Sequence, residues 1–370
     1  MQDKNTPAVS AEELSVGYGK ITVAGGITFA VEKGELLTLI GPNGAGKSTI
    51  LRSIAAQLPL LSGRVAIDGA ELSSIGAKRL SKQLAIVLTE RIHAERMTCR
   101  DVISTGRYPY TGRLGLLSEQ DEAAVDEAME LTGVTYLAEA DFREISDGQR
   151  QCVMLARAIA QQPDVLLLDE PTSFLDINHK LGLLALLRKL AAQKNIAVIQ
   201  SLHELDLAER FSDRLLCIRD KQAVLFGTPE EVFAGDFIER LYGITAGSFH
   251  NSYGFAEPKV VGGEPQVFVI GGGGRAIPVY RELNRRGIPF AAGVIHENDI
   301  ELPAARSLAA ELFTEAAFEP ISEKSIAAAL LVLERCGKVL CCCEGFGSMN
   351  AGNAVLRERA EKKGTLVTKL

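Results

Sequence analysis

The stretch "GPNGAGKST", residues 41–49, contains residue types that bind phosphate, at the spacing that this chemistry needs. It fits G-x-x-x-x-G-K-[ST], in which glycines let backbone N–H groups wrap around phosphate oxygens without obstruction by side chains. Lys47 would reach the β and γ phosphates, and Ser48 would hold Mg²⁺. The helix that begins at "STILRSIAAQL" would direct its positive N-terminal dipole at the anion. The motif therefore predicts a bound nucleotide.

A second stretch, "VLLLDEPTSFLD" at residues 165–176, is an apolar strand that delivers two adjacent carboxylates. Ligands of open α/β sheets bind at the carboxyl ends of the strands. In phosphoryl transfer, Asp169 would support the hydrated Mg²⁺, while Glu170 would orient and deprotonate the attacking water. A solvated strand end is the alternative for such a pair, and the phosphate loop upstream favours the catalytic interpretation.

Length and composition describe the kind of protein that carries these residues. The chain has 370 residues, 46% hydrophobic and 24% charged, which favours two folded domains over a disordered or fibrous chain. A net charge of −7 disfavours nucleic acid as a partner. No signal pattern or apolar run of about eighteen residues is present, so we expect neither export nor a membrane span. The seven cysteines suit a reducing compartment, and the triplet at 341–343 is expected in the core.

The strands and helices expected around these motifs must position their phosphate-binding and catalytic residues. Residues 12–40 predict an antiparallel β layer, residues 91 to about 160 a helical insertion, and the strand–helix alternation after "DVLLLDE" a parallel sheet. The Gly/Pro break "VGGEPQ" precedes a fresh strand–glycine–helix unit. We therefore expect a first domain at 1–260, a linker at 261–266 and a second, α/β domain at 267–370.

With these motifs in this order, residues 10–255 resemble the ATP-binding-cassette ATPases. "ISDGQRQ" resembles the family signature, in which Ser146 and Gly148 would bind the γ phosphate of a nucleotide held by a second copy. "SFLD" resembles the loop whose aspartate, Asp176, bridges the copies. His203 matches the switch histidine and Tyr18 the aromatic that stacks on adenine. The alternatives without a functional role are a helix cap for Ser146, a structural histidine for His203 and a turn residue for Tyr18.

The resemblance implies the fold, the ligands and the site. The implied fold is a P-loop NTPase cassette with a mixed sheet core, an antiparallel β layer and a helical insertion, followed by a small Rossmann-like domain. The implied ligands are ATP and Mg²⁺. The implied catalytic residues are Glu170, His203 and Lys47, and the implied metal ligands are Ser48 and Asp169. The residues implied to contact nucleotide are Tyr18, Gly41, Pro42, Asn43, Gly44, Ala45, Gly46, Lys47, Ser48, Thr49, Ser146, Gly148, Gln149 and Asp176.

Two positions depart from the family pattern. Thr89 and then Glu90 stand where the coupling loop normally carries glutamine. Asp147 replaces the usual first glycine of the signature pair and adds a carboxylate near a phosphate site. We expect the side chain of Asp147 to point away from the nucleotide.

Within the family, "MTCRDVISTGRYPYTG" resembles the ATPase subunits of importers for ferric siderophores, haem or cobalamin. The segment at 106–112 would meet the permease, although a simple Pro/Gly turn is the alternative. The implied partners are a second copy, a separate integral membrane permease and, indirectly, a substrate-binding protein, at the cytoplasmic face of the membrane. A soluble cassette ATPase without transport, such as one serving iron–sulfur cluster assembly, is the second interpretation.

The C-terminal part carries a motif of its own. "VFVIGGGGRAIPVYRELNRRG" places Gly271, Gly273 and Ala276 in G-x-G-x-x-[GA] order between an apolar strand and a helix, which is the context of the Rossmann fingerprint. Glu297 and Asp299 fit the ribose-binding acid of that motif loosely. The sequence leaves open a regulatory pocket for a nucleotide or a cargo-related anion and a tight structural turn, of which the turn is favoured.

Overall fold

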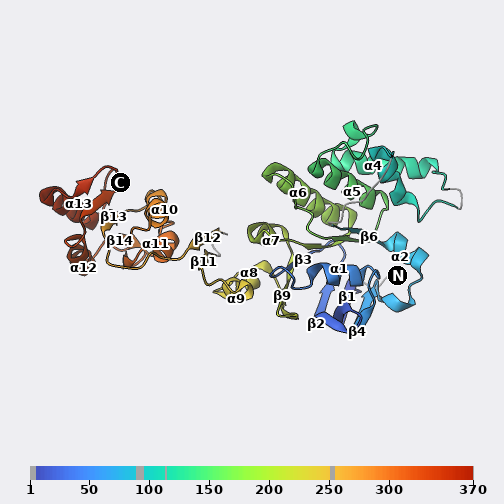
Figure 1. Cartoon of the computed structure of the whole chain (residues 1–370), viewed down its shortest axis with the longest axis horizontal. Helices are drawn as coiled ribbons and strands as arrows, with labels where there is room; N and C mark the ends of the chain where they lie inside the picture. The colour runs from blue at the N-terminus through green and yellow to red at the C-terminus, as the bar shows by residue number, and fades with distance from the viewer. Residues whose placement is uncertain (1–5, 89–95, 113–114, 251–254, 370) are drawn as a thin grey trace. The chain divides into compact units, whose positions relative to one another are not determined.

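The computed structural model describes residues 6–88, 96–112, 115–250 and 255–369 (Figure 1). The chain divides into two compact units, Met1–Tyr242 and Gly243–Leu370. Within the described residues, no helix is both long and apolar enough to cross a bilayer.

This division lies before the linker that we expected at 261–266. A two-stranded hairpin, β11 (Gly247–His250) and β12 (Phe255–Pro258), belongs to the second unit. The hydroxyls of Ser248 and Ser307 are 2.6 Å apart, and the buried carboxylate of Glu257 pairs with Arg281. These contacts attach the hairpin to the helices that follow it, so the Gly/Pro break is a turn within the second unit.

The first unit is built on a mixed ten-stranded sheet, in the order β5-β4-β1-β2-β10-β9-β3-β8-β7-β6. Its central strands are parallel, mostly apolar and buried at nearly every position, as is typical of strands covered on both faces. They are β3 (Leu36–Ile40), β6 (Leu84–Val87), β7 (Val165–Leu168), β8 (Ala197–Ser201) and β9 (Arg214–Arg219). The carboxyl ends of β3, β7 and β8 therefore meet at one edge.

The remaining strands pair mainly antiparallel, and β1 and β2 form the β layer predicted within residues 12–40, while β10 also pairs with β2 in parallel at one position. β1 pairs with both β2 and β4, and β9 forms a hairpin with β10. They are β1 (Val9–Tyr18), β2 (Ile21–Val31), β4 (Leu60–Ile67), β5 (Ala70–Glu71) and β10 (Gln222–Gly227).

Helices in the middle of the first unit form the expected insertion. Figure 1 shows α4 and α5 (green) grouped away from β1, β2 and β4 (blue). Thr98, Ser118 and Ser146 each begin a helix with a reciprocal capping box, which satisfies amides that the first turn leaves without partners. The helices of this unit are α1 (Lys47–Ile54), α2 (Ala77–Gln83), α3 (Cys99–Ser104), α4 (Glu119–Thr132), α5 (Asp147–Ala160), α6 (Ile177–Lys194), α7 (Leu205–Phe211), α8 (Pro229–Val232) and α9 (Phe237–Tyr242).

The second unit contains a five-stranded parallel sheet in the order β15-β14-β13-β16-β17. Helices α10 and α11 pack on one face and α12 and α13 on the other, over two separate apolar cores (Figure 1). The strands are β13 (Val267–Ile270), β14 (Phe290–His296), β15 (Glu311–Glu315), β16 (Lys338–Cys341) and β17 (Leu366–Val367). The helices are α10 (Ile277–Arg285), α11 (Leu302–Leu308), α12 (Glu323–Leu333) and α13 (Gly352–Lys363). The predicted small parallel α/β domain is confirmed.

The cysteine triplet is less buried than we expected. Only Cys341 lies in β16, and all three side chains are half-buried. Cys341 packs against one core of the unit and Cys342 against the other, as the alternation of side chains along an extended chain requires. Burial raises the pKa of Cys342 to about 12.

Candidate nucleotide site

The glycine loop between β3 and α1 adopts backbone angles that other residues rarely reach. Gly41 and Gly46 have φ of 150° and 104°. A Cβ atom at Gly41 would lie 2.1 Å from the carbonyl oxygen of Ile218, so no other residue fits there. Asn43, Gly44 and Thr49 lie in the same loop-to-helix turn, which an amide of Ala45 closes on the Pro42 carbonyl (3.1 Å). The turn aims the N-terminus of α1 into the loop.

Lys47, the first residue of α1, folds back into the loop. Its side chain is 6% exposed, and Nζ donates to the carbonyl oxygens of Gly41 (2.8 Å) and Pro42 (3.3 Å). Burial lowers the pKa of Lys47, and the nearby carboxylates of Glu170 and Asp169 oppose that shift. The loop thus holds a cation within reach of both carboxylates.

Asp169 lies directly after β7 and is buried. Its Oδ1 accepts from the hydroxyls of Ser48 (3.0 Å) and Ser201 (2.8 Å). Mg²⁺ prefers oxygen ligands and is commonly held by one or two carboxylates together with substrate phosphates. Ser48 and Asp169 supply a hydroxyl and a carboxylate oxygen in contact with each other, so this pair fits the ion.

Glu170 is held by partners on three sides. Its Oε1 lies 2.6 Å from Nε2 of His203, and its Oε2 accepts from the hydroxyl of Ser173 (3.1 Å). Its own backbone is in the left-handed region, with φ of 49°, and its amide donates to the hydroxyl of Ser201 (2.9 Å). The structure thus brings His203, 33 residues away, onto the carboxylate that sequence reasoning assigned as the base.

Two residues of this site were missed by the sequence analysis. Ser201, at the carboxyl end of β8 and fully buried, bonds both Asp169 and Glu170. The phenol of Tyr242 accepts from the amide of Gly41 (3.1 Å), and burial raises the pKa of Tyr242 to about 12. The position of Ser201 two residues before His203, at the end of an apolar strand, could have indicated the first. No local signal marks Tyr242, because it is 201 residues from Gly41.

The signature residues open helix α5 and are used there as a cap. The hydroxyl of Ser146 accepts from the amide of Gln149 (3.2 Å), and the Gln149 side chain accepts from the amide of Ser146 (2.9 Å). A Cβ at Gly148 would lie 3.2 Å from Leu175, so this helix start packs against the loop that ends at Asp176. The Asp147 carboxylate pairs with Arg150, one turn along the same helix (2.7 Å).

The remaining residues expected at the site are either exposed or outside the described residues. Asp176 caps α6 and accepts from the amide of His179 (3.0 Å), and this hydrogen bonding lowers the pKa of Asp176. Tyr18, at the end of β1, is 52% exposed. Thr89 and Glu90 lie outside the described residues.

Comparison with known proteins agrees with this geometry. The family described as ABC transporter matches residues 24–173. An uncharacterised ABC transporter ATP-binding protein of Methanocaldococcus jannaschii is 43% identical over 289 residues, which cover 77% of this chain and 99% of that protein. The chain belongs to the ATP-binding proteins of ABC transporters, a class of ATP hydrolases, and the predicted cassette is confirmed.

More distant relatives carry descriptive names. The ferric enterobactin transport ATP-binding protein FepC of Escherichia coli is 36% identical, over 63% of this chain and 86% of that protein. The cobalamin import ATP-binding protein BtuD of Halobacterium salinarum is 34% identical, over 81% and 77%. A solved metal-chelate type ABC transporter in an inward-facing conformation matches with a TM-score of 0.56 and 25% identity, over 64% of this chain and 88% of that one.

The second unit has a match of its own. The family described as MJ0874 family matches residues 290–369, which lie wholly within the second unit. The two family matches therefore fall in different units of the chain.

Proposed function

We propose that this chain is the ATP-hydrolysing subunit of an importer that takes up a ferric siderophore, haem or cobalamin through a separate membrane permease. The names of the relatives at 34–36% identity support a ferric siderophore or cobalamin as cargo, and they favour an importer over a soluble cassette without transport. The observation that carries the hydrolytic part is the contact of 2.6 Å between Glu170 and His203 beside the phosphate loop.

Glu170 is the proposed general base. Oε1 faces His203 and Oε2 is held by Ser173, so the carboxylate is oriented on both oxygens before substrate arrives. It would orient the attacking water and take its proton, while His203 holds the carboxylate and contacts the γ phosphate. Lys47 would neutralise charge on the β and γ phosphates. Mg²⁺ bound by Ser48 and Asp169 would neutralise charge on the phosphate oxygens.

We further propose that two copies share each site. Ser146 and Gly148 start α5 beside the loop of Asp176, whereas Lys47 starts α1, so the phosphate-binding groups are divided between two helix N-termini. Each N-terminus is suited to bind an anion. In a pair of copies, the N-terminus of α5 in one copy would close on the nucleotide held by the phosphate loop of the other. Tyr18 of the copy that holds the nucleotide would stack on the adenine.

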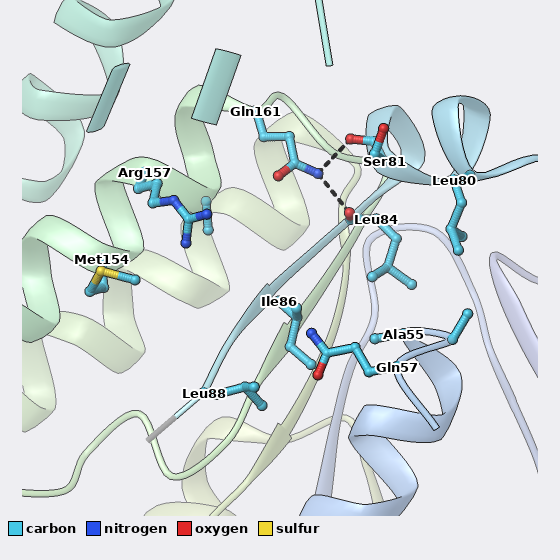
Figure 2. A pocket seen from close by; sticks show the side chains of 13 residues that line it. Ala55, Gln57, Leu80, Ser81, Leu84, Ile86, Leu88, Met154, Arg157 and Gln161 are labelled. Carbon is cyan, nitrogen blue, oxygen red and sulfur yellow. Dashed lines mark hydrogen bonds between the residues drawn. The ribbon is translucent and has the colours of Figure 1, made fainter. Parts of the chain in front are cut away.

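The permease would dock over a pocket of about 520 Å³ at the edge strand β6. Figure 2 shows Met154 and Arg157 of α5 on one side and Leu80 and Ala55 on the other, with Ile86 between them. Gln161 closes one end, because its amide donates to the carbonyls of Ser81 (2.8 Å) and Leu84 (2.6 Å) (Figure 2). An apolar floor with a polar rim suits a segment of another protein.

The segment 106–112 borders this pocket. The phenol of Tyr110 donates to the Gln161 carbonyl (3.1 Å), and its ring packs 3.9 Å from the guanidinium of Arg107. Tyr108 beside it is 63% exposed, which leaves an aromatic side chain available to a partner. This supports the permease contact that the resemblance implied for the segment.

Substitution of Glu170 tests the catalytic part. The Glu170→Gln variant should bind Mg·ATP and form ATP-bound dimers, while kcat falls by about 10²–10⁴, as expected for loss of a positioned base. Glu130→Gln, an exposed position on α4, is the matched control. Near-normal turnover in Glu170→Gln would remove Glu170 from the role of base.

Reconstitution tests the importer part. The chain and its permease would be placed in liposomes with the binding protein, and ATP hydrolysis would be measured with a ferric siderophore, haem or cobalamin. One cargo should raise the rate, and Tyr108→Ala should reduce that stimulation while leaving basal hydrolysis unchanged. No stimulation by any of the three would contradict the proposed cargo class.

A further inference from the structure

The glycine loop of the second unit is filled by carboxylates of its own chain. This loop follows β13, where a Rossmann fingerprint would bind pyrophosphate. Here the amides of Gly272 (3.0 Å) and Ala276 (3.1 Å) donate to Oε2 of Glu301. The amide of Gly273 donates to Oδ2 of Asp299 (2.8 Å). The amides that a phosphate would need are therefore already bonded to anions.

Glu301 is built into the fold. It is fully buried, and the phenol of Tyr280, also buried, donates to its other oxygen. Burial raises the pKa of Glu301, and its three hydrogen bonds oppose that shift. The arginine of the loop, Arg275, pairs with Glu344 (3.3 Å). A phosphate at this loop would meet two carboxylates, so the loop is not a phosphate site.

A pocket of about 350 Å³ lies beside the loop, at the carboxyl ends of the parallel strands. Ligands of open α/β sheets bind in this position. Gly273 comes from the loop after β13, Asp299 from the segment after β14, Phe318 from the loop after β15, and Met349 from the segment after β16. The volume is at the lower end of the range for small-molecule sites.

The polar side of this pocket is rich in hydrogen-bond acceptors. His296 Nε2 donates to the carbonyl of Glu319 (2.9 Å), which leaves Nδ1 of the neutral ring as an acceptor. The carboxylate of Asp299 accepts from the amides of Gly273 and Glu301 and keeps further lone pairs, and Asn298 adds a side-chain amide. Asp299 also follows β14, the second strand of the parallel sheet in chain order, where a dinucleotide-binding acid accepts from ribose hydroxyls. Hydroxyl donors of a ligand fit the acceptors of His296 and Asp299, and a negative charge next to Asp299 would be repelled.

The other side of the pocket is apolar. Ile300 and Met349 line it, and Phe318 is 78% exposed. Phe318 also has φ of 64°, a left-handed backbone conformation that is unfavourable for a bulky residue. Burial in the core does not explain this strain, whereas strain held by the surrounding fold is common at ligand sites. An exposed ring at the edge of a pocket can stack on a planar ligand.

We propose that this pocket binds a nucleoside without a phosphate, with the base against Phe318 and the ribose hydroxyls donating to Asp299. A planar base fits the apolar side, and hydroxyl donors fit the acceptors opposite. The carboxylates that fill the glycine loop select against nucleotides. The site is separate from the cassette's ATP site and does not depend on transport.

The test is calorimetry on the full chain with adenosine as the probe, in excess Mg·ADP so that the cassette sites are filled. Adenosine should bind, and AMP should bind more weakly. Phe318→Ala should weaken adenosine binding by about 10-fold or more, as loss of a stacking ring does. Leu331→Ala removes a comparably exposed apolar side chain of the same unit and should have no effect.

Three outcomes would overturn the proposal. They are no heat with adenosine, guanosine or cytidine at millimolar concentration, tighter binding of AMP than of adenosine, and equal adenosine affinity in the Phe318→Ala and Leu331→Ala variants. The last result would show that any adenosine heat arises without the ring of Phe318. Circular dichroism of both variants would verify that each is folded before the titration.

Discussion

Replacement of Ser201 by alanine should damage both stability and turnover, because one buried hydroxyl holds both carboxylates of the site. The change removes a hydrogen bond to the Asp169 carboxylate (2.8 Å), which is worth about 1.5–3 kcal/mol. It also leaves the amide of Glu170 without its acceptor at 2.9 Å. We expect the free energy of unfolding of the first unit to fall by about 2–5 kcal/mol.

Turnover should fall as well. Asp169 keeps the hydroxyl of Ser48, and Glu170 keeps His203, so neither carboxylate is lost. Their orientation would relax, and a displacement near 1 Å costs up to about 10²-fold in rate. We therefore expect kcat to fall by about 10–10²-fold, less than in Glu170→Gln.

Thermal unfolding and ATP hydrolysis measure the two effects. The transition that Mg·ADP shifts belongs to the cassette, since ligand binding stabilises the unit that holds it. Its Tm should fall by at least about 4 °C. Ser73→Ala is the control, because it removes an exposed serine hydroxyl of the same unit that donates to Glu71 and not to the site. If Ser201→Ala unfolds and hydrolyses ATP like the control, the buried hydroxyl does not organise the site.

Three further predictions concern buried charges. Arg107→Ala should lower the free energy of unfolding of the first unit by about 3–5 kcal/mol in urea unfolding, because it leaves buried Asp121 without its cation (2.8 Å). Hydrogen bonds from Ser118, and then Arg107, lower the pKa of Asp121 from 3.8 to about 2. The ionised carboxylate of Asp121 therefore stabilises the fold, and this stabilisation is complete above about pH 4. It is lost as the pH falls through about 2. Asp121→Asn should thus narrow the stability difference between pH 5 and pH 3. Glu301→Leu should destabilise the second unit by about 2–5 kcal/mol in thermal unfolding, since two amides and the Tyr280 phenol lose their acceptor; an unchanged Tm would contradict this.

Much of the cassette could be predicted because its motifs are local. The phosphate loop, the strand followed by Asp169 and the start of α5 each lie within about ten residues, so their spacing alone predicts the chemistry. The strand–helix alternation predicted after "DVLLLDE" is present as α6, β8 and α7. Strand and helix periods were sufficient for these elements.

The remaining site contacts join residues that are far apart in the sequence, so they could be seen only in the folded structure. Tyr242 reaches Gly41 only after the chain has completed the sheet, and no spacing rule connects them. In the second unit, the fingerprint glycines were read correctly as a strand–loop–helix turn, but the buried acid proved to be Glu301, at the start of α11. A sequence shows that a loop can wrap an anion. It does not show that the anion is a side chain of the same protein.

The contacts within the phosphate loop have a consequence for nucleotide exchange. Lys47 is bonded to carbonyl oxygens of Gly41 and Pro42, and Ser48 is bonded to Asp169. When ADP leaves, Lys47 can return to carbonyl oxygens of the loop and Ser48 to Asp169 after β7, so neither side chain has to stay buried without a partner. Product release then requires an exchange of hydrogen-bond partners, and the next ATP meets a loop that already has its shape.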